Sequence, residues 1–110
     1  MIVRTWSATA TPEGASDYSR YFAGTLLPEL RDLPGFAGAY LLSRDLTDSN
    51  AVEVTAHTFW DSFEAIHAFA GDDITVSIVE AEAQAMLIDF DRTADHRTVV
   101  VDARSDRALR

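Results

Sequence analysis

The chain has 110 residues, a length typical of one domain, and 47% of them are hydrophobic, enough to build a single core. It contains no cysteine and no lysine, which excludes thiol nucleophiles, disulfides, thiolate metal sites and lysine Schiff bases. The net charge of -9 disfavours nucleic acid and anionic membranes as partners. No apolar stretch approaches the roughly 18 residues of a membrane span and the start lacks a signal-peptide layout, so we expect a cytoplasmic protein.

The chain begins with a predicted strand and a long helix. Ile2 to Thr11 is rich in β-branched residues, which is typical of a strand, and Pro12-Glu13-Gly14 indicates a turn. Ser16 is expected to cap the helix that follows. Pro28 removes a backbone donor inside this helix and predicts a kink or restart, and Pro34-Gly35 ends the helix. The apolar stripe of the helix consists of Tyr18, Phe22, Leu26, Leu30 and Leu33.

Two strands and a second helix follow. Phe36 to Leu46 and Ala51 to Trp60 have the composition of strands, joined by the hairpin turn 47–50. Asp61 is expected to cap the second helix and Gly71 to end it. The expected inner face of this helix carries Phe63, Ile66, Phe69 and Ala70.

The remaining segment predicts one more strand and completes the fold. Residues 72–84 indicate a short irregular or helical stretch, and Arg97 to Val101 is the last predicted strand. The order β-α-β-β-α-β predicts an α+β, ferredoxin-like fold, with a four-stranded antiparallel sheet and helices on one face only. We place the domain at residues 1–102 and expect 103–110 to form a flexible tail.

The sheet is predicted to be apolar on both faces, which indicates a partner. In the strand 51–60, alternation places half of the residues on each face. An apolar open face usually meets another surface, so we expect a homodimer whose sheets pack face to face as a dimeric α/β barrel. A large apolar patch on a monomer is the alternative. One face carries Val52, Val54, Ala56 and Trp60, and the other carries Glu53, Thr55, His57 and Phe59.

The junction after the third predicted strand resembles a known family. Trp60, Ser62, Glu64 and Ala65 match the Trp-x-Ser-x-Glu-Ala junction of the antibiotic biosynthesis monooxygenase superfamily, and Arg4-x-Trp6 fits a subgroup of small, mostly uncharacterised members. The resemblance implies a dimeric ferredoxin-like barrel and oxidation of aromatic intermediates or quinols without a bound metal, flavin or other cofactor. Some members cleave haem with an Asn on the first strand and a Trp and a His near the second helix. This sequence has no Asn on the first strand.

Histidines are the side chains with acid–base ability near neutral pH. We predict His57 and His96 as catalytic candidates that meet at one end of the sheet near Ala8 to Ala10. A histidine there could deprotonate a phenol or hydroquinone, whose anion then reacts with oxygen. The alternative is a hydrogen-bonded His57 in the sheet or dimer interface and a polar His96 at a strand edge.

An arginine and several aromatic residues are candidates for substrate binding. Arg4 lies in the middle of the first strand, where an unpaired charge is costly, so it should pair with Glu53 or bind an anionic substrate. The aromatic residues could line a pocket for an aromatic ligand or simply fill the core. These candidates are Trp6, Tyr18, Phe22, Tyr40, Phe59 and Trp60.

The leading hypothesis is a cofactor-independent monooxygenase that acts on a small electron-rich aromatic compound or quinol. A non-catalytic dimeric module that binds a small ligand or a protein is the main alternative, and an isomerase or lyase on the same fold is a third. The late acidic residues, including Asp89 and Asp91, fit no metal-loop spacing, so no metal site is predicted.

Overall fold

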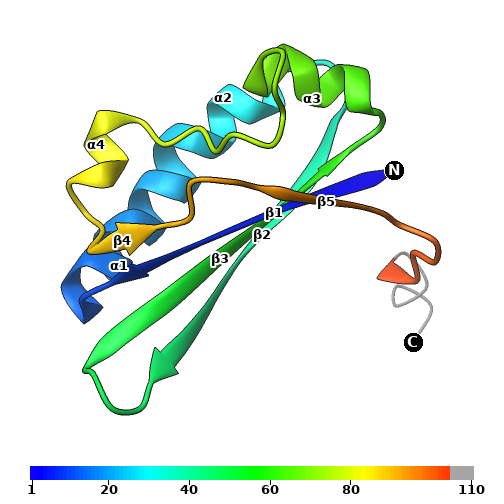
Figure 1. Ribbon diagram of the computed structural model, residues 1–110. Helices are drawn as coiled ribbons and strands as arrows, with labels where there is room; N and C mark the ends of the chain where they lie inside the picture. The colour runs from blue at the N-terminus through cyan, green and yellow to red at the C-terminus, as the bar shows by residue number, and fades with distance from the viewer. Residues whose placement is uncertain (105–110) are drawn as a thin grey trace.

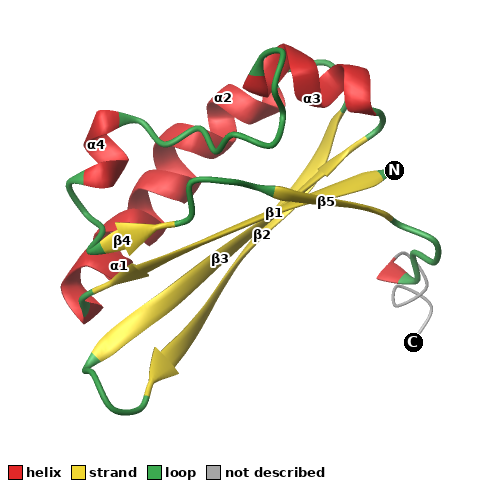
Figure 2. Cartoon of the chain, in the orientation of Figure 1, coloured by secondary structure: helices red, strands yellow, loops and turns green. Residues whose placement is uncertain are grey.

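The computed structural model describes residues 1–104 and consists of one twisted antiparallel sheet with all helices on one side (Figure 1, Figure 2). This is the predicted α+β architecture. Within the described residues, no helix is long and apolar enough to cross a membrane. In chain order the elements are β1 (Ile2–Ala10), α1 (Pro12–Tyr21), a π-helix (Phe22–Leu26), α2 (Leu27–Arg31), β2 (Phe36–Leu46), β3 (Ala51–Trp60), α3 (Phe63–Ala70), α4 (Ala81–Gln84), β4 (Asp89–Phe90) and β5 (Asp95–Thr98).

The sheet has the order β2-β3-β1, and β4 and β5 both pair with β1. β4 was not predicted, and β5 stands in place of the predicted last strand, so the sheet has five strands instead of four. The predicted position 97–101 is wrong for its last three residues, because β5 ends at Thr98, opposite Ile2 where β1 begins. Val100 and Val101 have strand propensity but no partner strand, and both are exposed.

Alternation along β1 and β3 sorts their side chains between the helices and the open face of the sheet. Ile2, Arg4 and Trp6 face the helices and are buried, whereas the residues between them are only half-buried. In β3 the predicted face of Val52, Val54, Ala56 and Trp60 is likewise the buried one. The core thus lies between this face and the helices.

The first helix begins earlier than predicted. Thr11 is its N-cap and accepts a hydrogen bond from the Gly14 N–H at 3.0 Å, with Pro12 at the first helical position, so the expectation of Ser16 as cap is wrong. The helix passes through the π-helix into α2, where Pro28 lies in the first turn. A proline lacks the N–H of the regular ladder, and the local widening of the helix ahead of it confirms the predicted disturbance.

The second predicted helix also has a different cap. Ser62, not Asp61, is extended and accepts from the Ala65 N–H at 3.2 Å. Phe63 is exposed, contrary to its predicted inner position, with its ring centroid 6.2 Å from that of His96, while Ile66 is fully buried. Gly71 ends the helix with φ 86°, a conformation that favours glycine.

The open face of the sheet carries apolar side chains. Tyr40 and Leu42 on β2 are 44% and 46% exposed there. The Tyr40 and Phe59 rings meet edge to face, and the Arg104 guanidinium lies 4.5 Å from the Phe59 ring centroid. The predicted tail 103–110 falls largely outside the described residues. The homodimer stays a prediction.

Candidate functional site

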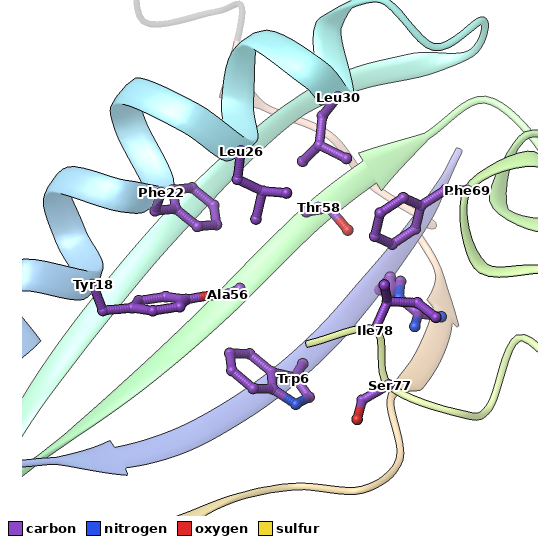
Figure 3. Close-up of a pocket in the computed structure, with 11 residues that line it drawn as sticks. Trp6, Tyr18, Phe22, Leu26, Leu30, Ala56, Thr58, Phe69, Ser77 and Ile78 are labelled. Atoms are coloured by element: carbon purple, nitrogen blue, oxygen red, sulfur yellow. The ribbon is translucent and has the colours of Figure 1, made fainter. Parts of the chain in front are cut away.

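An apolar pocket lies between the sheet and the continuous helical segment formed by α1, the π-helix and α2 (Figure 3). The space open to the centre of a water molecule is about 50 Å³. That volume holds water, but it is far below the roughly 300 Å³ of a typical small-molecule site. The lining residues are Arg4 and Trp6 of β1, Tyr18 of α1, Phe22 and Leu26 of the π-helix, Leu30 of α2, Ala56 and Thr58 of β3, Phe69 of α3, and Ser77 and Ile78 of the following segment.

Arg4 supplies the charged group of this lining. Its residue is only 5% exposed, and burial lowers the pKa of its guanidinium. The guanidinium donates to the carbonyl oxygens of Ile74 and Val76, at 3.0 Å for the Val76 oxygen, and lies 5.6 Å from the Phe69 ring centroid. The predicted pairing with Glu53 is wrong, because Glu53 lies opposite Thr9 on β1 and binds Arg44 instead.

His96 is the neighbour of Arg4 on β5. Its Nε2 lies 3.0 Å from Arg4 Nη1, and because an arginine has only donors, this nitrogen must accept. His96 is therefore neutral in this arrangement, with its proton on Nδ1. Burial and then the Arg4 charge lower the pKa of His96 below 6.5, against a smaller opposing effect of Asp95. His96 thus touches the pocket only through Arg4.

Trp6 and Tyr18 form the aromatic wall. The Trp6 indole Nε1 donates to the Asp91 carbonyl oxygen at 2.9 Å, which fixes the ring against the segment before β5. The two ring centroids are 6.0 Å apart. Tyr18 is 4% exposed, and its hydroxyl is directed into the pocket (Figure 3). The hydroxyl has no hydrogen-bond partner among residues 1–104, and it is accessible to solvent in the pocket, because no buried side-chain polar atom in this part of the chain lacks a partner. Burial raises the pKa of this phenol well above its ordinary value of 10.

A second hydroxyl in the lining is already engaged. Thr58 is opposite Arg4 in the register of β1 and β3, and its Oγ1 accepts from the Trp60 indole Nε1 at 2.9 Å. Because Oγ1 accepts that bond, its own proton remains available to a ligand. Trp60 is fully buried between Phe36 and Phe69 and does not line the pocket.

The structure brings some of the predicted site residues together and separates others. Arg4, Trp6, Tyr18 and Phe22 line one pocket, and their role in substrate binding stays a prediction. The prediction that His57 and His96 meet near Ala8 to Ala10 is wrong. His57 is opposite Thr5 on the open face, whereas His96 is opposite Arg4 on the helix side. Tyr40 and Phe59 share the open face with His57, and Trp60 lies in the core.

Several lining residues were not predicted as site residues. Leu26 and Leu30 belong to the predicted apolar stripe, and Thr58 shares the alternation of Ala56, so both groups carried a detectable signal. Ser77 and Ile78 lie in a segment without regular structure, and no pattern in the sequence indicated them.

Comparisons with solved structures identify the fold of this chain. No known family profile and no curated protein matches the chain. Among solved structures, a proposed antibiotic biosynthesis monooxygenase from Bacillus cereus is 18% identical over 92% of this chain and 94% of its own, with a TM-score of 0.58. SnoaB, a cofactor-independent oxygenase from Streptomyces nogalater, is 15% identical over 94% and 97%, with a TM-score of 0.56. The chain has the fold of the antibiotic biosynthesis monooxygenases.

This fold includes proteins of different chemistry. The heme-degrading protein of Mycobacterium tuberculosis is 25% identical over 93% of this chain and 94% of its own, with a TM-score of 0.52. The predicted resemblance is thus confirmed for the fold, and a shared fold does not determine the reaction.

Proposed function

We propose that the protein is a cofactor-independent monooxygenase that oxidises a small electron-rich aromatic compound in the pocket between sheet and helices. The observation that carries the proposal is an apolar, aromatic-lined pocket that contains one buried cation, Arg4. Aromatic walls favour a flat apolar substrate, and a cation favours the ionised form of its hydroxyl group. The oxygenase SnoaB, which has the same fold, supports this class of reaction.

The reaction is balanced without a bound cofactor. A phenol that loses its hydroxyl proton to solvent becomes an anion with electron density on a ring carbon. This carbon reduces O2 and forms a C–O bond with it, and the peroxide takes up a proton. Loss of water then converts the carbon to a carbonyl, so that phenol and O2 give quinone and water. The apolar walls exclude solvent while the phenolate carbon reacts with O2.

The pocket must widen to take a ring. Ser77 and Ile78 are the lining residues that lie outside helices and strands. Their segment is attached by the Ser77 N–H and Oγ, which donate to the Arg92 and Asp91 carbonyls at 3.0 and 2.8 Å. We propose that this wall moves outward with the substrate, since the other walls belong to packed elements.

Of the two predicted catalytic histidines, His96 has a role in this proposal. It is a positioning residue, because its Nε2 accepts from Arg4 and holds the guanidinium beside the pocket. His96→Ala should lower kcat/KM, mainly through KM. His96→Gln should restore part of it, because the Gln amide oxygen can accept from Arg4.

Oxygen uptake with a panel of quinols and anthrones tests the proposal. Ala56→Val narrows the pocket and should lower the rate at least about tenfold, by a steric cost of the order seen for overpacked cores. His57→Ala is the matched control, because it changes the neighbouring residue on the other face of the sheet. Absence of uptake with every compound would refute the oxygenase and favour a binding module. Equal rates in Ala56→Val and the wild type would refute this pocket as the site of the oxidation.

We also propose that two copies associate through the open face of the sheet. The support is the exposed pair Tyr40 and Leu42 next to the half-buried Phe59. Large contiguous apolar surface is uncommon on a soluble monomer. The pocket lies on the opposite side of the sheet, so each copy would keep its own entrance.

A further inference from the structure

We propose that the Arg4 end of the pocket is an anion subsite that binds an ionised oxygen of the ligand, of the phenolate class. This inference rests on the proposed function for the identity of the substrate, but the binding step can be tested without any oxidation. Such a subsite would make the pocket bind the phenolate form of a ligand in preference to the neutral phenol.

The first argument is charge. Arg4 is buried, and its partners are two carbonyl oxygens and a neutral histidine. In the described part of the chain, carboxylates pair with Arg20, Arg44 and Arg104, and none pairs with Arg4. Neutral acceptors solvate a guanidinium but do not neutralise it, so a positive charge persists in an apolar pocket.

The second argument is the count of donors. A guanidinium carries five N–H groups. Both protons of Nη1 are used, by the Ile74 oxygen and His96, and one proton of Nη2 is used by the Val76 oxygen. The second Nη2 proton and the Nε proton have no partner among residues 1–104. Two unused donors on one planar group suit an anionic oxygen, which accepts stronger hydrogen bonds than a neutral one.

The third argument is independent of Arg4. The Tyr18 hydroxyl is directed into the same pocket and has no hydrogen-bond partner among residues 1–104. The Thr58 hydroxyl accepts from Trp60, so its proton is available for donation to a ligand. All three groups offer donors, and none of the described residues that line the pocket is a carboxylate that would repel an anion. The other titratable group beside Arg4 is His96, which is neutral and faces Arg4. The pocket is therefore built to receive an acceptor.

The consequence is selection of the ionised ligand. A buried cation that donates to a phenolate favours it over the phenol, and the acidity of the bound hydroxyl group rises. Charge-assisted hydrogen bonds of this type correspond to a preference of about tenfold or more, or a downward shift of about one pKa unit in the bound phenol.

The probe is 4-nitrophenol, a one-ring compound whose phenolate absorbs visible light and whose ring is too electron-poor to be oxidised. At a pH below its own pKa, adding the protein should increase the phenolate absorbance. The methyl ether 4-nitroanisole, which cannot ionise, should bind at least about tenfold more weakly. Arg4→Met should abolish the absorbance change, Arg4→Lys should retain part of it, and His57→Gln on the open face should behave as the wild type.

Equal affinities for 4-nitrophenol and 4-nitroanisole in the wild type, or an unchanged spectral response in folded Arg4→Met, would overturn the subsite. The wild-type comparison decides the question even if Arg4→Met fails to fold. Phenolate binding without oxidation of any quinol would leave the subsite standing and remove the oxygenase. Oxidation of quinols without a preference for binding the phenolate would support the oxygenase and remove the anion subsite.

Discussion

Deleting one hydroxyl group should have very different effects on stability at two positions in the same pocket. Thr58→Val removes the oxygen that accepts from the Trp60 indole Nε1 at 2.9 Å. Trp60 is 0% exposed, so its N–H would be left without a partner, which costs about 1–3 kcal/mol. Tyr18→Phe removes a hydroxyl that has no protein partner in the described chain and is accessible to solvent in the pocket, so the free energy of unfolding should change by less than about 1 kcal/mol.

Urea denaturation of both variants, followed by far-ultraviolet circular dichroism at one pH, measures this difference. The shared pocket makes each variant the control for the other, because both lose one hydroxyl and keep their apolar shape. Thr58→Val should shift the midpoint to lower urea without changing the m-value. A neutral Thr58→Val would mean that the indole N–H finds another acceptor. A Tyr18→Phe variant less stable by more than about 1 kcal/mol would mean that its hydroxyl is hydrogen-bonded.

Three further predictions follow from single contacts. The lowered pKa of His96 means that the unfolded chain takes up a proton that the native state resists, so stability should fall as pH drops below about 6.5; His96→Gln should flatten that part of a pH series of thermal melts. Gly14→Ala should destabilise the fold by about 1–3 kcal/mol in the same urea assay, because a Cβ there would lie 2.3 Å from the Met86 carbonyl oxygen. Gly24→Ala is the control: its Cβ would have no atom within 4 Å, so the free energy of unfolding should stay the same or rise by up to about 1 kcal/mol. Leu42→Asp should convert a sedimenting dimer to a monomer while Ser19→Asp on exposed α1 should not, and a wild-type monomer at micromolar concentration would exclude the dimer.

The strands could be predicted because alternation and β-branched residues were strong local signals. β2 and β3 have the predicted bounds, and β1 ends one residue early. The last strand was misplaced because Val99–Val101 has high strand propensity, yet pairing needs a partner and β1 begins only at Ile2. The N-cap residues were predicted wrongly because more than one residue near each helix start is able to cap it. Thr11 and Ser16 are both able to cap a helix, and Pro12 was the signal that distinguished them.

The candidate site could be predicted only as far as a repeating pattern extends. The helical stripe contains Tyr18 and Phe22, and the first strand contains Arg4 and Trp6. The structure brings these four residues into one pocket, and their role in binding stays a prediction. The contact of Arg4 with Ile74 and Val76 joins residues about seventy positions apart, across a segment with no periodicity. The face of His96 depends on the register of β5 against β1, and a shift of one residue reverses the face.

The buried charge of Arg4 affects both the stability of the fold and the binding of a ligand. A buried cation with only neutral acceptors around it lowers the stability of the unliganded fold relative to a fold with a well-packed apolar side chain at that position. A ligand that brings a negative charge to the free donors removes part of that cost and binds the native state alone. Stability should therefore rise with the concentration of 4-nitrophenol, by about 2.7 kcal/mol at one hundred times its Kd. Thermal melts above and below the pKa of 4-nitrophenol should show a larger rise where it is ionised, and a rise that is equal at both pH values would mean that the pocket does not sense the charge.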